Sequence, residues 1–452
     1  MKLPGRRRAV RRLSGALVCA ALTLLYGVGP VAAQSIVFGT PSATSKFGVN
    51  IVFQQPYSGA TVKSASVLVQ QPGDVGPTVL ALTSIGAANL VYTMDTSTGG
   101  FYPNTPITAR FEVVLTDGSV VDGPEIDITY ADDRYSWHTK VGKIVRLHYI
   151  QASDSFASQM LAWGETGVQK ASSFFGVDES KPIDFFVYPS EAIFQQGLSQ
   201  AGTIGGVTLS SFRTCFAAVA PDDSYGRSVI PHELTHVVFA DASDSPYHNP
   251  PRWLNEGLAV YLADGFDASD RQLVKQAVKN GTLKSLLAYT DYFPLDASRI
   301  YLAYAESVSA IDFMIRKYGQ PAVAKLVRAY ANGVTDDEAF KAGIGVDTAT
   351  FTSAWMVDNG VTPTTYGPQP APTGPLPPGW NGSSPGTAVT PGPTDTGVGV
   401  SPKPSPGPGS STPGSGGDQD AYAVAAMIAI VGFVLLGLAR LVSIRQGRPG
   451  AV

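Results

Sequence analysis

The sequence contains few cysteines and few charged residues, and each scarcity excludes a class of protein. Only 2 of the 452 residues are cysteine. Cys19 lies in a segment that we expect to be removed, so Cys215 has no partner for an intramolecular disulfide, and a disulfide-stabilised scaffold is excluded. The apolar neighbours of Cys215 predict a buried core residue. Charged residues form 15% and hydrophobic residues 44% of the chain. Its length of 452 residues suggests about two to three domains, enough to bury a full enzyme core.

Basic residues are scarce outside the first segment of the chain. Residues 1–33 hold six of the 32 Lys and Arg residues and no acidic residue. The remainder has 26 basic against 36 acidic residues, which is a net charge of −10. Because an acidic protein repels polyanions, the composition predicts that nucleic acid is not a partner.

Both ends of the chain carry signals for export and membrane attachment. Residues 1–33 combine an Arg-rich start, an apolar stretch and a Val-Ala-Ala site, which predicts a signal peptide cleaved after Ala33. A retained N-terminal anchor is the alternative. Residues 421–443 begin with about 19 uncharged residues, enough to span a bilayer. Acidic residues precede them and arginines follow, so we expect an extracytoplasmic ectodomain, one transmembrane helix and a cytoplasmic tail at 444–452, in the cell membrane.

The rest of the chain divides into three segments. Residues 34–132 show period-two alternation of apolar side chains, which predicts an all-β, sandwich-like accessory domain. Residues 133–360 predict an α+β, mostly helical domain, with a helix over about 153–175 and a strand over 183–188. Residues 361–420 are dominated by Pro, Gly, Ser and Thr and predict a disordered stalk.

A metal-ligand motif lies in the second domain. Residues 231–239 read Pro-His-Glu-Leu-Thr-His-Val-Val-Phe in a segment with a helical pattern. Residues four apart share one face of a helix, so His232 and His236 can bind the same ion. Glu233 lies toward the open side of that ion, where it can accept a proton from a bound water.

A second motif supplies a third ligand 20 residues after the first. Trp-Leu-Asn-Glu-Gly at 253–257 begins another helix, and a turn rich in Asp, Ser and Pro lets this helix fold back. Two histidines and one glutamate leave the fourth zinc position open for water. The two motifs therefore predict a catalytic Zn²⁺ site with His232, His236 and Glu256 as ligands and Glu233 as general base.

Together the two motifs resemble those of the gluzincin metallopeptidases, the thermolysin-like clan, and most closely its "peptidase MA-like" group. The resemblance covers about residues 137–359 and implies a thermolysin-like zincin fold and a peptide or protein substrate. The second motif is also similar to that of aminopeptidase N relatives, whose Gly-x-Met-Glu-Asn substrate-amine motif is not found here. Family members commonly stabilise the oxyanion with a downstream Tyr or His. For this role we select Tyr304, with Tyr301 as the alternative.

Several other polar residues have no ligand-like spacing. His138, His148 and His248 are predicted to be surface or core histidines, although His248 lies between the two motifs and could contact substrate. Glu306 is predicted to be a charge on a helix face near Arg316 or Lys317, with a role behind a zinc-bound histidine as the alternative. The glycine-rich segment 202–206 lacks the Lys-Ser/Thr of a phosphate-binding loop and predicts a flexible loop or an edge strand lining the cleft.

Three functions fit these residues. The leading hypothesis is a membrane-anchored, extracytoplasmic zinc metallopeptidase that uses zinc-activated water and Glu233. The alternative is a non-catalytic, zinc-containing cell-surface protein that binds a partner or a cell-wall polymer. A structural zinc site is normally closed by four protein ligands and needs no base, which argues against this alternative. Hydrolysis of a non-peptide amide or ester would use the same residues.

Overall fold

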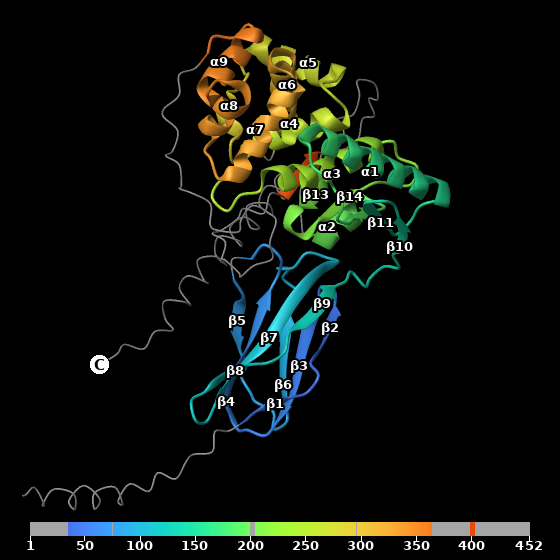
Figure 1. Ribbon diagram of the computed structural model, residues 1–452. Coiled ribbons are helices and arrows are strands. Elements are labelled where there is room, and N and C mark those ends of the chain that lie inside the picture. The colour runs from blue at the N-terminus through green and yellow to red at the C-terminus, as the bar shows by residue number, and fades with distance from the viewer. Residues whose placement is uncertain (1–34, 75, 199–203, 295, 364–397, 403–452) are drawn as a thin grey trace, which may run out of the picture.

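The computed structural model describes residues 35–74, 76–198, 204–294, 296–363 and 398–402 (Figure 1). These residues form a β-sandwich followed by a domain in which helices gather on a mixed sheet. The predicted signal peptide, transmembrane helix and cytoplasmic tail lie outside the described residues. Within the described part of the chain, no helix is both long enough and apolar enough to cross a bilayer.

The first domain is a pair of antiparallel sheets, as its alternating sequence predicts. Strands β1, β2 and β6 pair with β3 in one sheet, and the other has the order β5-β4-β7, with β8 and β9 also paired to β7. The strands are β1 Val37–Phe38, β2 Ser42–Lys46, β3 Asn50–Ser58, β4 Val62–Gln70, β5 Thr78–Ala81, β6 Asn89–Asp95, β7 Thr105–Leu115, β8 Val120–Asp122 and β9 Ile126–Tyr130.

The core of this sandwich follows from period-two alternation. In β7 every second residue is buried. Ile107, Phe111 and Val113 share one hydrophobic cluster with Val67 of the neighbouring strand β4 and with Phe53 of β3 in the other sheet. Alternate side chains of a strand point to opposite faces, so one face of each sheet joins this core and the other meets solvent.

The second domain is built on a mixed sheet with the order β10-β11-β12-β14-β13. The central strands β11, β12 and β14 are parallel, and β10 and β13 run antiparallel to their neighbours. Strand β13 begins at residue 204, within the glycine-rich segment at 202–206. The strands are β10 His138–Val141, β11 Val145–Tyr149, β12 Ile183–Tyr188, β13 Ile204–Leu209 and β14 Thr214–Ala218.

Helices cover this sheet and then continue alone toward the end of the domain (Figure 1). Helix α3 packs against α1, against α4 and against strand β13. The helices are α1 Asp154–Phe175, α2 Glu191–Leu198, α3 Gly226–Ser243, α4 Arg252–Ala263, α5 Ala268–Asn280, α6 Ala297–Tyr318, α7 Gln320–Ala329, α8 Asp336–Ile344 and α9 Thr348–Asp358. The predicted helix at 153–175 and strand at 183–188 are thus confirmed.

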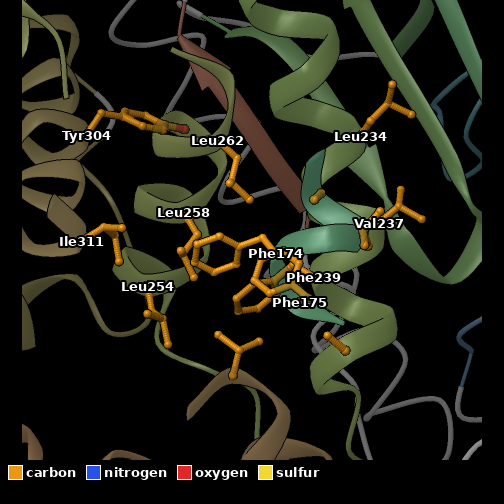
Figure 2. Packing of buried hydrophobic residues seen from close by; sticks show 14 of the residues in the cluster. Phe174, Phe175, Leu234, Val237, Phe239, Leu254, Leu258, Leu262, Tyr304 and Ile311 are labelled. Atoms are coloured by element: carbon orange, nitrogen blue, oxygen red, sulfur yellow. The ribbon is translucent and has the colours of Figure 1, made fainter. Parts of the chain in front are cut away.

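Aromatic and aliphatic side chains fix α3 and α4 relative to each other. Figure 2 shows Phe174 and Phe175 of α1 beside Phe239 of α3, facing Leu254 and Leu258 of α4. All five side chains are buried in the same hydrophobic cluster. Full burial of side chains of this size stabilises a fold by roughly 1.5–3 kcal/mol each. This packing holds the two motif-bearing helices at a fixed separation.

One short segment of the predicted stalk differs from the sequence expectation. Residues Val398–Pro402 form strand β15, drawn in red in Figure 1, and pair antiparallel with the outer edge of β13. The prediction of disorder is therefore wrong for these five residues. An edge strand presents unpaired N–H and C=O groups, and a Val-Gly-Val sequence has enough β-propensity to pair with them.

Candidate metal centre

Three side chains from α3 and α4 converge on one point. The Nε2 atoms of His232 and His236 lie 3.1 Å apart, and each lies 3.4 Å from Oε2 of Glu256. The two histidines lie one helical turn apart, and Glu256 comes from the second turn of α4. The structure therefore brings together the three ligands predicted from sequence.

These distances fit a tetrahedral metal ion. Ligand atoms about 2.0–2.1 Å from one tetrahedral ion are separated from one another by roughly 3.3–3.4 Å. The three residues are 5%, 1% and 1% exposed, so water does not screen their charges. Burial by itself would raise the pKa of the Glu256 carboxyl, but His236, His232 and Arg252 hold it well below its ordinary range. The donor set is that of a zinc site with one position left open.

Two neighbouring residues orient these ligands. Oδ1 of Asn255 lies 2.8 Å from Nδ1 of His236, so Nδ1–H donates there and the lone pair of Nε2 faces the site. A guanidinium nitrogen of Arg252 lies 3.3 Å from Oε1 of Glu256, which turns Oε2 toward the histidines. Neither role was predicted, although Asn255 and Arg252 stand beside Glu256 in the motif.

The predicted base lies beside strand β13. Glu233 is fully buried, and its Oε2 lies 2.6 Å from Oγ1 of Thr208. The same hydroxyl is 2.9 Å from the backbone oxygen of Glu233, so Thr208 donates to one of two acceptors on that residue. A Cβ atom on Gly206 would lie 2.3 Å from Oε1 of Glu233. Only glycine at this position lets the strand pass the carboxylate without displacing it.

Tyr304 also reaches this centre, from α6. Its ring centroid is 6.2 Å from that of His232, and Figure 2 shows the ring extending from α6 toward α4. The hydroxyl is buried and has no hydrogen-bond partner within the described residues. Burial and the nearby Glu256 raise its pKa well above the ordinary value, so it remains a neutral donor. Gly257 permits this approach, because a Cβ atom there would lie 2.8 Å from the backbone oxygen of Ser307.

The comparisons with known proteins agree with this geometry. Residues 164–358 match the Peptidase MA superfamily, and the match includes both motifs and Tyr304. By this match the segment resembles the Peptidase MA superfamily, the group whose motifs the sequence carries. No curated protein matches the chain.

Several solved structures are similar to parts of this chain. The M1 zinc metallopeptidase of Deinococcus radiodurans is 12% identical over 75% of this chain and 97% of its own, with a TM-score of 0.35. An aminopeptidase N family protein of Idiomarina loihiensis is 11% identical over 72% and 73%, with a TM-score of 0.35. OgpA of Akkermansia muciniphila is 19% identical over 22% of this chain and 28% of its own, with a TM-score of 0.17. The chain therefore spans about a quarter of OgpA.

The other three histidines make their contacts outside the metal centre, as the sequence predicts. Nε2 of His148 lies 2.8 Å from Asp184 on the neighbouring strand, and His138 is exposed on β10. Nε2 of His248 lies 2.8 Å from Asp336, which also accepts from a tyrosine hydroxyl. His248 therefore attaches the loop between α3 and α4 to helix α8.

The prediction for Glu306 is wrong. Its side chain is fully buried, and it accepts the backbone N–H of Lys284 at 2.9 Å instead of lying near Arg316 or Lys317. Burial raises its pKa to about 7. The prediction for Cys215 is confirmed, because this side chain is buried in the core.

Proposed function

We propose that the protein hydrolyses peptide bonds with zinc-activated water and with Glu233 as the general base. The observation that carries the proposal is the position of a buried carboxylate next to three converging zinc ligands. Glu233 follows His232 directly on α3, so its place relative to the ligands is set by the helix itself. A site that served structure alone would have no use for this carboxylate.

The residues of the chain divide the reaction between them. Zinc held by His232, His236 and Glu256 would lower the pKa of water and polarise the substrate carbonyl. Glu233 accepts a proton from the attacking water and later donates it to the nitrogen of the leaving amine. The hydroxyl of Thr208 holds one carboxylate oxygen of Glu233 at 2.6 Å, so this proton transfer starts from a fixed position.

Tyr304 is proposed to stabilise the oxyanion. It supplies a hydroxyl donor that is buried at the metal centre and has no other partner among the described residues. A donor that is in place before the reaction stabilises developing negative charge without reorganisation. Tyr301 is only half-buried and lies near Tyr225, whose pKa it raises, so the observations favour Tyr304 for this role.

We propose, from the sequence alone, that the enzyme is exported and attached to the cell membrane. Residues 1–33 have the pattern of a signal peptide and residues 421–443 that of a single span. The arginines after this span favour a cytoplasmic C-terminus and an extracytoplasmic metallopeptidase domain. Digestion of this domain by a protease added to intact cells would test this orientation.

The peptidase proposal is tested by comparing the zinc-loaded full chain with its Glu233→Gln variant. Both proteins are incubated with a diverse peptide mixture, and the new termini are identified by mass spectrometry. We expect products only from the wild type, with equal zinc content in the two proteins and loss of activity after chelation. Equal cleavage by the variant would contradict the role of Glu233. An inactive wild type with full zinc content would favour the non-catalytic binding protein.

A further inference from the structure

A cavity of about 580 Å³ lies between helix α2 and the strands β13 and β14. Its volume is within the range of about 300–1,000 Å³ that is typical of ligand-binding sites. Gly205 of β13 and Ala218 of β14 form part of its wall. Glu191 at the start of α2 also lines the cavity, together with Asp223 and Tyr225 before α3.

Two residues of this wall connect the cavity to the catalytic base. Gly205 precedes Gly206, at which a Cβ atom would lie 2.3 Å from Oε1 of Glu233. Tyr225 directly precedes α3, and burial and the charge of Glu233 both raise the pKa of its hydroxyl. A side chain in the cavity would therefore belong to a residue close to the bond on which Glu233 acts.

The edge of β13 shows how an extended peptide reaches this cavity. Residues of β15 pair antiparallel with it, Val400 with Val207 and Ser401 with Gly206. The register shifts between Ile204 and Gly206, so the ladder leaves Gly205 at the cavity wall without a partner in β15. A substrate that paired with the same edge would replace β15, run beside Thr208 and Gly206, which approach Glu233, and reach Gly205 at the cavity wall.

The lining of the cavity combines acidic and apolar residues. Two carboxylates, Glu191 and Asp223, line it, and no Lys or Arg does so among the described residues. Glu191 accepts from the side chain of Gln195 at 3.1 Å, and Asp223 accepts from the backbone N–H of Tyr225 at 3.0 Å. These bonds orient the two carboxylates, while alanines and a proline supply the apolar surface.

We propose that this cavity binds a lysine or arginine side chain of the peptide substrate, from a residue adjacent to the scissile bond. The aliphatic stem of such a side chain suits the apolar wall, and its cation suits the two carboxylates. The proposal rests on the peptidase function proposed above and adds a substrate class to it.

The test uses matched pairs of fluorogenic peptides with the full chain in detergent. Each pair differs only in having lysine or norleucine at one of the positions that flank the scissile bond. Norleucine keeps the stem and removes the charge. At one position we expect kcat/KM to be roughly tenfold higher for lysine, as one charge-assisted hydrogen bond provides. The double variant Glu191→Gln/Asp223→Asn should bring this ratio close to one.

The control is Asp222→Asn, which removes one negative charge from an exposed residue outside the cavity wall, where the double variant removes two from the wall itself. It should leave the lysine preference intact. An equal loss of preference in this control would overturn the assignment to the cavity, because the attraction would then come from the general surface charge. Thermal melting of each variant verifies folding.

The outcomes separate this inference from the proposed function. Equal cleavage of both members of every pair by the wild type would overturn the cavity proposal and leave the peptidase function standing. Cleavage of neither member of any pair would overturn both the cavity proposal and the peptidase proposal. Binding of the same pairs to zinc-loaded Glu233→Gln protein gives a readout without turnover, and tighter binding of the lysine peptide is the expected result.

Discussion

Asn255 provides a sharp test of how the zinc ligands are oriented. Its Oδ1 accepts the Nδ1–H of His236 at 2.8 Å, which fixes the tautomer of a buried ligand. Loss of such a contact typically weakens metal affinity about 10–100-fold, or roughly 1.4–2.7 kcal/mol. We expect Asn255→Ala to show this loss when zinc affinity is measured by competition with a fluorescent chelator at fixed pH.

Asn255→Asp is the matched variant, because it keeps an acceptor at the same place. We expect it to bind zinc at least as tightly as the wild type, since a carboxylate makes the imidazole a more basic ligand. Unchanged affinity in Asn255→Ala would refute the reasoning, and so would equal losses in both variants. Circular dichroism of the metal-free proteins separates lost orientation from lost folding.

Three further predictions concern the centre and its surroundings. Gly206→Ala should abolish peptide hydrolysis while zinc remains bound, because its Cβ would meet Oε1 of Glu233 at 2.3 Å; an active variant would contradict this steric argument. Tyr304→Phe should lower kcat about 10²–10³-fold with little change in KM, measured by steady-state kinetics; a change in KM alone would count against oxyanion stabilisation. Glu306→Gln should stabilise the fold against denaturant by about 3 kcal/mol at pH 8.5 and by less at pH 5.5. Burial raises the pKa of Glu306 to about 7 from 4.5, so the stability that its protonated form contributes is complete below pH 4.5 and is lost as the pH rises through 7. An equal effect at both pH values would refute that account.

The metal ligands could be predicted because their spacing is local. His232 and His236 are one turn apart, and helix geometry alone brings them together. The third ligand, Glu256, could be predicted because the turn between the two helices needed only to reverse the direction of the chain. The alternation of apolar residues in the first domain likewise predicted its strands, since burial along a strand has a period of two.

The remaining parts of the site depend on contacts that sequence spacing does not encode. Thr208 and Gly206 meet Glu233 only because β13 is placed next to α3 by the sheet, and the glycine-rich sequence pointed only to a loop or an edge. Glu306 has the sequence context of a surface charge but faces the interior, because the segment at Lys284, which precedes α6, packs over it. Side-chain environments set by such long-range packing override local propensity.

Strand β15 changes how the kinetics of this enzyme should be interpreted. Residues 359–397 join the end of α9 covalently to a strand on the edge of β13. An attached strand competes for this edge as an intramolecular ligand, so its occupancy does not fall when the protein is diluted. A free peptide that pairs there must first displace it. The apparent KM of the whole chain then equals the intrinsic value divided by the fraction of molecules in which β15 leaves the edge free, even at the lowest enzyme concentration.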